Sequence, residues 1–343
     1  MTAVITNPMA VYENTTALRQ VFEYLPEMDY IFELITNFIG IFPLSLSIYF
    51  FKKLKLFHVN LTSLLINMMT SYLIRTVFRI PVVTYNMFVS VEYYQEKHII
   101  IQHIDTICAI CQYVCGVDLC LIFLERLYAT NKASAYESQT HNRMTIVAIL
   151  FLWFLVTVLL YLSSYGYINI LVLVLSSVML LTISGIGMIY LLSLNHKLYR
   201  NKVNTQTNLS YRYQVAENIR SFQMLLPMLG LLLLGCIFGV IFYSTMLYIE
   251  SPLIRALNGL VFTAMVACGS IILPIFAFFC HRTLRHSFFK AIKLKVRPLQ
   301  RSDITRSSVT AYNIPMTLNG QKLIVGTNEC TDVYFQQIQK MWN

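Results

Sequence analysis

Seven stretches of the chain are apolar for about 20 residues or more, the length that an α-helix needs to cross the hydrocarbon core of a bilayer. The pattern predicts an all-α membrane protein, a seven-transmembrane helix bundle. The short turn around Gly166 separates two of the stretches, and each of these two is long enough to span alone. The predicted spans are Tyr30–Phe51, His58–Ile80, Ile104–Tyr128, Met144–Tyr165, Tyr167–Leu194, Ser221–Ile249 and Ala256–Cys280.

The segments around the bundle, which covers residues 30–280, differ from it in character. Residues 1–29 precede the first span and carry no apolar signal-peptide core. In residues 281–297, Leu284, Phe288 and Ile292 recur at helical spacing among basic residues, which predicts a short amphipathic helix on the inner leaflet, bound to membrane lipid. The polar tail, 298–343, is expected to be mostly disordered.

The positions of lysine and arginine predict the orientation of the bundle. With the N-terminus extracellular, 21 of the 26 Lys and Arg residues lie on the cytoplasmic side, three lie outside and two lie within the second span. This asymmetry predicts an extracellular N-terminus and a cytoplasmic C-terminus. The sequon Asn14-Thr15-Thr16 then lies outside, which predicts glycosylation at Asn14.

Composition and missing motifs exclude several classes of protein. Only 12% of the residues are charged, about half of what soluble domains contain, and 57% are hydrophobic. The net charge of +10 does not indicate a nucleic-acid partner, because the basic residues lie between apolar runs rather than on one face. The eight cysteines lack zinc-finger spacing and are expected to be packed thiols. HExxH, GxSxG and P-loop motifs are absent, so we predict no catalytic, metal or cofactor site.

Four charged residues fall at similar depth in the outer third of the predicted bundle. At a rise of about 1.5 Å per residue, Arg75 and Arg79 lie roughly 22 and 28 Å above the inner end of their helix, with Glu33 and Asp105 at roughly 28–30 Å. Charges within a membrane usually face the bundle interior, so we expect these four to line or brace an extracellular pocket. The alternative is that both arginines reach outward to the headgroups.

In the third span, residues spaced three or four apart form one helix face that points into the bundle, and the outer end of this face carries Asp105, Cys108 and Gln112. We predict that these three residues and the two arginines bind the ligand. Lower in the same helix, we expect Asp118 either to pair with water or a polar group such as Asn67, or to be neutral because burial favours the uncharged form. Gly235-Cys-Ile-Phe-Gly239 has the GxxxG spacing of close helix contacts, and we expect ordinary packing there.

A candidate switch lies where the third span meets the cytoplasm. Glu125-Arg126-Leu127-Tyr128 ends this span, and Glu217 lies at the same level at the inner base of the sixth. We expect Arg126 to bridge to Glu217 in a resting state, because an ion pair between two helices can be broken when one of them moves.

Four short patches of the sequence carry a resemblance to a known family. The patches are Glu125–Thr130 with Tyr136-Glu137, Phe57–Leu61, Tyr211–Arg220, and Asp332–Phe335 with Trp342. On these patches the chain resembles the G-protein-coupled receptors, and among them the nematode serpentine chemoreceptors of class epsilon, with class ab as a close alternative. The resemblance implies a chemosensory receptor that binds a small extracellular ligand and activates a heterotrimeric G protein. It also implies a multi-pass protein of the plasma membrane, with a sensory cilium as one option.

The chain departs from the wider rhodopsin-like pattern at several positions. Leu273-Pro274-Ile-Phe-Ala277 stands where that family has Asn-Pro-x-x-Tyr, and no Trp precedes Pro227. Cys108 occupies the position that amine receptors fill with Asp, and Ile101 that of the usual third-helix cysteine. These departures put a conventional activation switch and an amine ligand in doubt.

Other membrane functions remain as alternatives. A transporter would show inverted repeats and helices broken at mid-membrane, whereas Pro274 interrupts only one segment. A ligand-gated channel of the insect seven-helix type would have the opposite orientation. An intramembrane enzyme would need a second acidic group at the depth of Asp118, and the sequence shows none.

Overall fold

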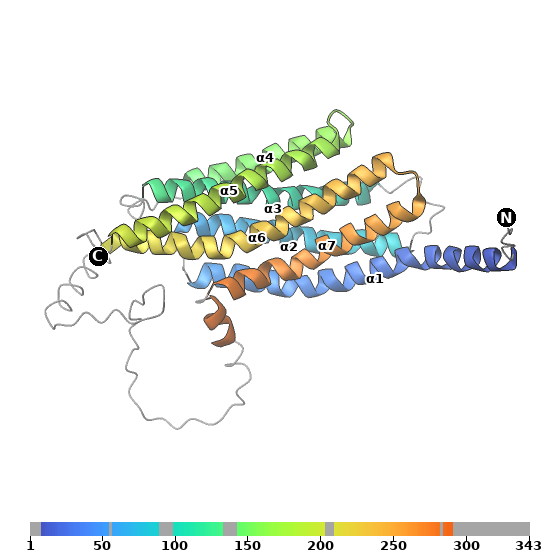
Figure 1. Cartoon of the computed structure of the whole chain (residues 1–343), viewed down its shortest axis with the longest axis horizontal. Helices are drawn as coiled ribbons and strands as arrows, with labels where there is room; N and C mark the ends of the chain where they lie inside the picture. Colours follow the sequence, from blue (N-terminus) through green and yellow to red (C-terminus); the bar gives the residue numbers. More distant parts are fainter. Residues whose placement is uncertain are drawn as a thin grey trace, which may run out of the picture. The chain divides into compact units, whose positions relative to one another are not determined.

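The structure, a computed structural model, describes residues 8–54, 57–88, 99–132, 143–202, 209–281 and 284–290. Within this part, seven long helices form a bundle, and each is long and apolar enough to cross a membrane (Figure 1). The predicted all-α, seven-span architecture is therefore confirmed. The helices are α1 (Pro8–Leu54), α2 (Val59–Phe88), α3 (Ile99–Asn131), α4 (Arg143–Ser164), α5 (Ile170–Lys202), α6 (Leu209–Tyr248) and α7 (Pro252–Cys280).

Several helices continue well beyond the apolar stretches that predicted them. Helix α1 starts at Pro8, and its candidate membrane span is Met28–Leu54. The backbone at Asn14 is therefore helical, while the side chain of Asn14, and so its predicted glycosylation, lies outside the described residues. The predicted tail, 298–343, also lies outside them.

The turn between α4 and α5 confirms that these are two spans. Gly166 has a φ of +80°, the left-handed region that glycine adopts without a steric penalty. The Gly166 N–H donates to the carbonyl of Ser163 and the Tyr167 N–H to that of Leu162, both at 3.0 Å, which is the Schellman pattern of a helix end. The side chain of Asn169 then accepts a hydrogen bond from the Leu171 N–H at 2.9 Å and caps α5.

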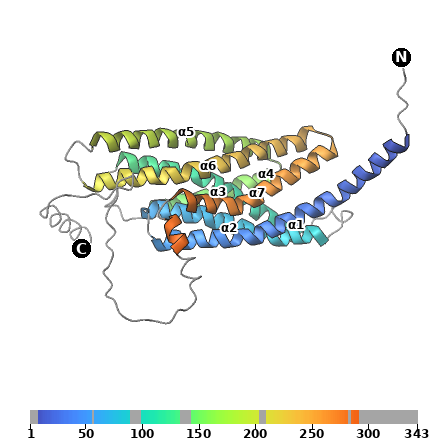
Figure 2. The same ribbon diagram turned by 60° about the horizontal axis from the view of Figure 1, so that its bottom comes forward.

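Side-by-side packing of the helices buries two clusters of apolar side chains, a large one and a smaller one between α3 and α4. Helix α1 lies against α2 and α7, α2 against α3, α5 against α6, and α6 against α7 (Figures 1 and 2). The main core cluster draws on most of the helices and includes Leu61, Met68, Leu119 and Phe222, all fully buried. Large apolar side chains also cover the outer surface, as expected where a helix faces lipid.

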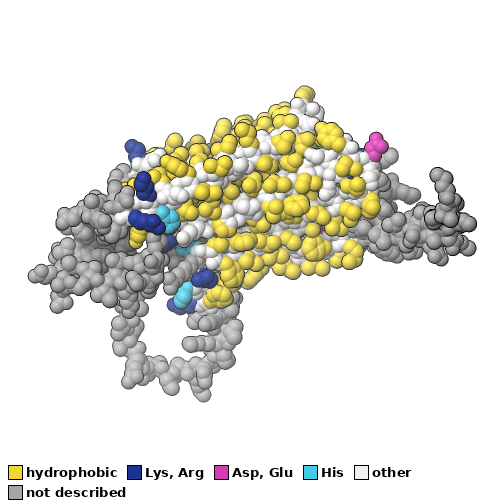
Figure 3. All heavy atoms as spheres, viewed as in Figure 1, with side chains coloured by type: hydrophobic (Ala, Val, Ile, Leu, Met, Phe, Trp, Pro, Cys, Tyr) yellow, Lys and Arg dark blue, Asp and Glu magenta, His cyan; other side chains and the backbone are white. Residues whose placement is uncertain are grey.

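Polar residues mark the two ends of the bundle. In Figure 3 the described surface is largely apolar between the ends, and the Lys, Arg and His side chains gather at one of them. This end, called the basic end here, carries the exposed side chains of Lys52, Lys53, Lys132, Lys197 and Arg200. It corresponds to the side that the lysine and arginine count assigns to the cytoplasm.

A short eighth helix follows α7 at the basic end and covers residues 284–290. Leu284 is buried in the main core cluster, and the ring of Phe288 lies 5.0 Å from that of Phe278. Burial, with Arg220 acting in the same direction, lowers the pKa of His281 to about 4, so its ring is neutral at physiological pH and accepts a hydrogen bond from the Leu284 N–H at 3.3 Å. The predicted amphipathic helix is present, and residues 291–297 of it lie outside the described part.

The orientation is testable with epitope tags at the two termini in intact cells. We expect antibody to reach an N-terminal tag directly and a C-terminal tag only after the membrane is permeabilised, because lysine and arginine are retained on the cytoplasmic side. An N-terminal tag that needs permeabilisation would show that the orientation is inverted.

The contact between α1 and α7 yields a second prediction. A Cβ atom at Gly40 would collide with the side chain of Ser270, which is fully buried. We expect Gly40→Ala to lower the free energy of unfolding by about 1–3 kcal/mol, as overpacking does, measured by thermal unfolding in detergent. Gly40→Ala with Ser270→Gly is expected to recover most of this loss.

Gly230→Ala is the matched control for Gly40→Ala. Gly230 also lies within a helix, but a Cβ atom there meets nothing within 4 Å. A loss of stability as large in Gly230→Ala as in Gly40→Ala would contradict the close approach of α1 and α7.

Candidate functional site

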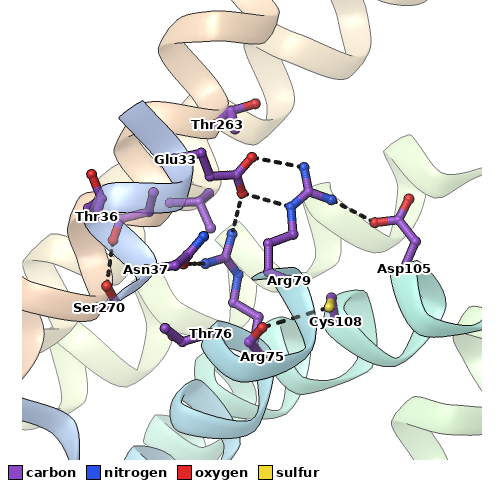
Figure 4. Close-up of polar contacts among 12 residues, drawn as sticks. Glu33, Thr36, Asn37, Arg75, Thr76, Arg79, Asp105, Cys108, Thr263 and Ser270 are labelled. Atoms are coloured by element: carbon purple, nitrogen blue, oxygen red, sulfur yellow. Dashed lines mark hydrogen bonds and ion pairs between the residues drawn. The ribbon is translucent and has the colours of Figure 1, made fainter. Parts of the chain in front are cut away.

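The end of the bundle opposite the basic end holds a connected group of buried charges. Arg79 of α2 donates from Nε and Nη2 to the two carboxylate oxygens of Glu33 in α1, at 2.7 and 3.2 Å (Figure 4). Its Nη1 donates to Oδ1 of Asp105 in α3, also at 2.7 Å. One guanidinium thus connects three helices.

Arg75 lies one turn before Arg79 and points into the same group of side chains. Its Nη1 donates to Oδ1 of Asn37 at 3.2 Å, and its Nη2 lies 3.7 Å from the Glu33 carboxylate. The thiol of Cys108 lies 3.7 Å from the Arg75 carbonyl oxygen. Both arginines therefore end on partners inside the bundle rather than at the headgroups, which removes the alternative of outward-reaching arginines.

The spacing of these residues explains why they meet. Glu33 and Asn37 are four residues apart on α1, as Arg75 and Arg79 are on α2, so each pair occupies one helix face. Glu33 is fully buried and Arg75 is 5% exposed. Because an isolated charge within a membrane is expensive, each of these groups depends on its partners. Asn37 is not among the predicted site residues, although its spacing from Glu33 places it on the same helix face.

A cavity of about 610 Å³ opens beside this network. Residues of six helices, α2 to α7, line it. The five predicted ligand-binding residues are all among them, namely Arg75, Arg79, Asp105, Cys108 and Gln112. The structure thus brings the whole predicted set to one cavity.

Aromatic side chains line another part of the cavity. Phe242 of α6 and Phe262 of α7 stack with ring centroids 4.8 Å apart and an interplanar angle of 6°, and Tyr243 meets Phe262 edge-on. Gly235 and Gly239 line the cavity as well, and a Cβ atom at Gly235 would meet nothing within 4 Å. The expected packing role of the GxxxG motif is therefore wrong for Gly235, where the small residue leaves open space.

Two polar atoms in the cavity lining lack a hydrogen-bond partner among the described residues. They are Oε1 of Gln112 and the hydroxyl of Tyr113, and both are buried. An unsatisfied buried polar atom is costly, so a bound molecule with hydrogen-bonding groups would gain from meeting them. Gln112 is one of the predicted ligand-binding residues, whereas Tyr113, the next residue of α3, is not.

Deeper in the bundle, Asp118 is fully buried and meets the partner that the sequence analysis suggested. The Asn67 amide donates to Oδ2 of Asp118 at 3.1 Å, and its carbonyl accepts from the indole N–H of Trp153 at 3.0 Å. The other carboxyl oxygen, Oδ1, has no hydrogen-bond partner among the described residues. This chain of contacts connects α2, α3 and α4.

At the basic end, Arg126 is fully buried at the bottom of α3. Its guanidinium pairs with the neighbouring Glu125, with Nη2 to Oε1 at 2.7 Å, and Nη1 donates to Oδ1 of Asn218 in α6 at 2.9 Å. The carboxylate of Glu217, the preceding residue, accepts a hydrogen bond from the His58 backbone N–H at 2.9 Å. The predicted bridge from Arg126 to Glu217 stays a prediction.

Further amides and a hydroxyl extend this network to α5. Thr130 accepts hydrogen bonds from Asn195 at 3.1 Å and from Asn218 at 3.3 Å. All three side chains are largely or fully buried, whereas Tyr128 is 45% exposed. Asn195 and Asn218 are not among the predicted site residues, because whether their side chains face α3 depends on the rotation of α5 and α6 about their axes.

Among the residues that the structure describes, no group of three His, Cys, Asp or Glu side chains could hold a metal ion. The seven cysteines of this part are free thiols.

Comparison with known proteins places the fold and the family. No curated protein matches the chain. Among solved structures, it is similar to squid rhodopsin, with a TM-score of 0.65 and 13% sequence identity over 81% of this chain and 89% of that one, a likeness of fold. The family model described as Sre G protein-coupled chemoreceptor matches residues 2–343. The chain therefore belongs to the Sre family of G protein-coupled chemoreceptors.

Proposed function

We propose that the protein binds a small extracellular molecule in the cavity and activates a heterotrimeric G protein at its basic end. The observation that carries this proposal is the path of α3, which contributes Asp105 to the cavity and Arg126 to the buried network at the other end. One rigid helix thus connects a site suited to a ligand with a site suited to a cytoplasmic partner.

The ligand site consists of Arg75, Arg79, Asp105, Cys108 and Gln112. Support comes from the cavity that they share and from its mixed surface, polar on α2 and α3 and aromatic on α6 and α7. Ligand pockets commonly combine an apolar lining with a few polar groups that fix orientation.

The switch involves Glu125, Arg126, Tyr128 and Glu217, to which the structure adds Asn218. Arg126 contacts α6 through Asn218, and Glu217 ties α6 to the residue before α2. Both contacts hold the basic end of α6 in place, so losing them favours its outward movement. The side chain of Tyr128 is 45% exposed at the same end.

The membrane environment follows from the same features. The protein is a multi-pass membrane protein, and we place it in the plasma membrane, including that of a sensory cilium, where an extracellular ligand can reach the cavity. Helix 284–290 contacts lipid at the inner surface with its exposed Arg285 and Lys290. The seven described helices run without a break at mid-membrane, which gives the transporter alternative no support.

The ligand site is testable once odorant screening with a calcium or cyclic-nucleotide reporter has identified an agonist. We expect Arg75→Gln and Asp105→Asn each to shift its potency by about tenfold, up or down, because each variant changes the charge that the cavity presents to the ligand and a hydrogen bond to a charged group contributes about 1.5–3 kcal/mol. Glu250→Gln, which removes an exposed charge outside the cavity lining, is the control and is expected to leave potency unchanged. Wild-type potency in both cavity variants, at matched surface expression, would contradict the site.

The switch predicts higher signalling in the absence of ligand when α6 is released. Asn218→Ala and Glu217→Ala are each expected to raise basal output about fivefold, because a loss of about 1 kcal/mol shifts a two-state equilibrium by that factor. Arg126→Ala is expected to abolish coupling. The measurement is basal reporter output at matched surface expression.

Gln214→Ala is the matched control for the switch variants. Gln214 is buried one turn before Asn218 on α6, and its Oε1 has no hydrogen-bond partner among the described residues. Unchanged basal output in both Asn218→Ala and Glu217→Ala would refute the switch, and an equal rise in Gln214→Ala would show a general loosening of α6.

A further inference from the structure

The charges around the cavity are unevenly placed. Arg75, Arg79 and Asp105 line it, whereas Glu33 is fully buried behind the arginines and is not part of the lining. The Arg75 guanidinium is held by Asn37 and lies beside Glu33, so Arg79 is the more exposed of the two arginine side chains. A guanidinium group in a cavity wall favours a ligand that carries a negative charge.

The hydrogen bonds of Arg79 show where such a charge fits. The edge formed by Nε and Nη2 is held by the buried Glu33 carboxylate, which fixes the plane of the guanidinium. Nη1 points the other way and meets Asp105, whose side chain is 36% exposed. A ligand can therefore displace Asp105 from Arg79 at much lower cost than it could displace Glu33.

We propose that the ligand is an organic acid whose carboxylate replaces that of Asp105 at Nη1 of Arg79. In the absence of ligand, the Asp105 carboxylate accepts the hydrogen bond from Arg79 that the ligand carboxylate accepts in the complex. The proposal deepens the receptor function proposed above and rests on it. Arg and carboxylate form strong charge-assisted hydrogen bonds, which suits a site that recognises one group in a small molecule.

The rest of the cavity specifies the body of the acid. The stacked rings of Phe242 and Phe262 offer an apolar surface for an aryl or alkyl chain. The unpartnered Gln112 Oε1 and Tyr113 hydroxyl would accept a hydrogen bond from a hydroxyl or amide group on that chain. The expected ligand class is thus an amphiphilic carboxylic acid.

An amine ligand fits the same side chains poorly. An ammonium group would have to take Asp105 from Arg79 and then lie beside the two guanidinium groups. Like charges at that distance repel, and Cys108, whose thiol lies 3.7 Å from the Arg75 carbonyl oxygen, offers a thiol rather than a carboxylate on α3.

The test uses the purified full-length protein in nanodiscs of uncharged lipid. The probes are 3-phenylpropanoate, 4-phenylbutanoate and octanoate, each with its methyl ester and the amine of the same skeleton, and the readout is the ligand-induced rise in melting temperature. We expect carboxylates to stabilise the protein and the matched esters and amines to have little effect. We expect Asp105→Asn to lower the Kd for the carboxylates at least about fivefold, because it removes both a competitor and a repelling charge.

Glu250→Gln serves as the electrostatic control, since it removes one exposed negative charge from the α6–α7 connection without touching the cavity lining. An equal gain in Glu250→Gln would assign the effect to net charge alone and overturn the proposal. So would amines that stabilise the wild type and lose their effect in Asp105→Asn, esters as effective as acids, or no stabilisation by any carboxylate in either protein. Raised basal signalling by Asn218→Ala would still support the receptor function in each of these cases.

Discussion

The fully buried Glu33 carboxylate is the constraint around which the outer half of the bundle is arranged. An unpaired carboxylate at this depth in a membrane is unfavourable, and α2 supplies two guanidinium groups to compensate it. Arg79 in turn needs Asp105 of α3 as a second partner. These contacts therefore fix the rotation and the height of the three helices relative to one another. The charged residues of the cavity lining, Arg75, Arg79 and Asp105, come from these helices.

The same principle operates at the basic end with different chemistry. Arg126 is as deeply buried as Glu33, and one of its contacts with another helix is made to a neutral amide, that of Asn218. A charge–amide contact is weaker than a bidentate ion pair, so less binding energy is needed to break this contact than to separate Arg79 from Glu33. The contrast fits the proposed function, in which the end that holds the cavity stays fixed and the basic end moves.

Hydropathy alone predicted the seven spans, because a membrane selects long apolar helices. Counting residues along each helix also predicted that Glu33, Arg75, Arg79 and Asp105 share one level, and the structure joins them. What counting cannot supply is rotation about each helix axis. Asn37 was missed beside Glu33, the aromatic wall was missed entirely, and Asn218, which meets Arg126 at the base of α6, was not named beside Glu217.

The tight turn at Gly166 has a mechanical consequence. It joins α4 and α5 through residues 165–169, and residues 249–251 join α6 and α7. At the end of the bundle that holds the cavity, the two helices of each pair are therefore held close together. Helix α6, with 40 residues, is about 60 Å long. A tilt of about 10° about its tethered tip therefore displaces its free end by about 10 Å. Under the proposed function, the hairpin of α6 and α7 is a lever that converts a small adjustment around a ligand into a wide opening at the far side of the membrane.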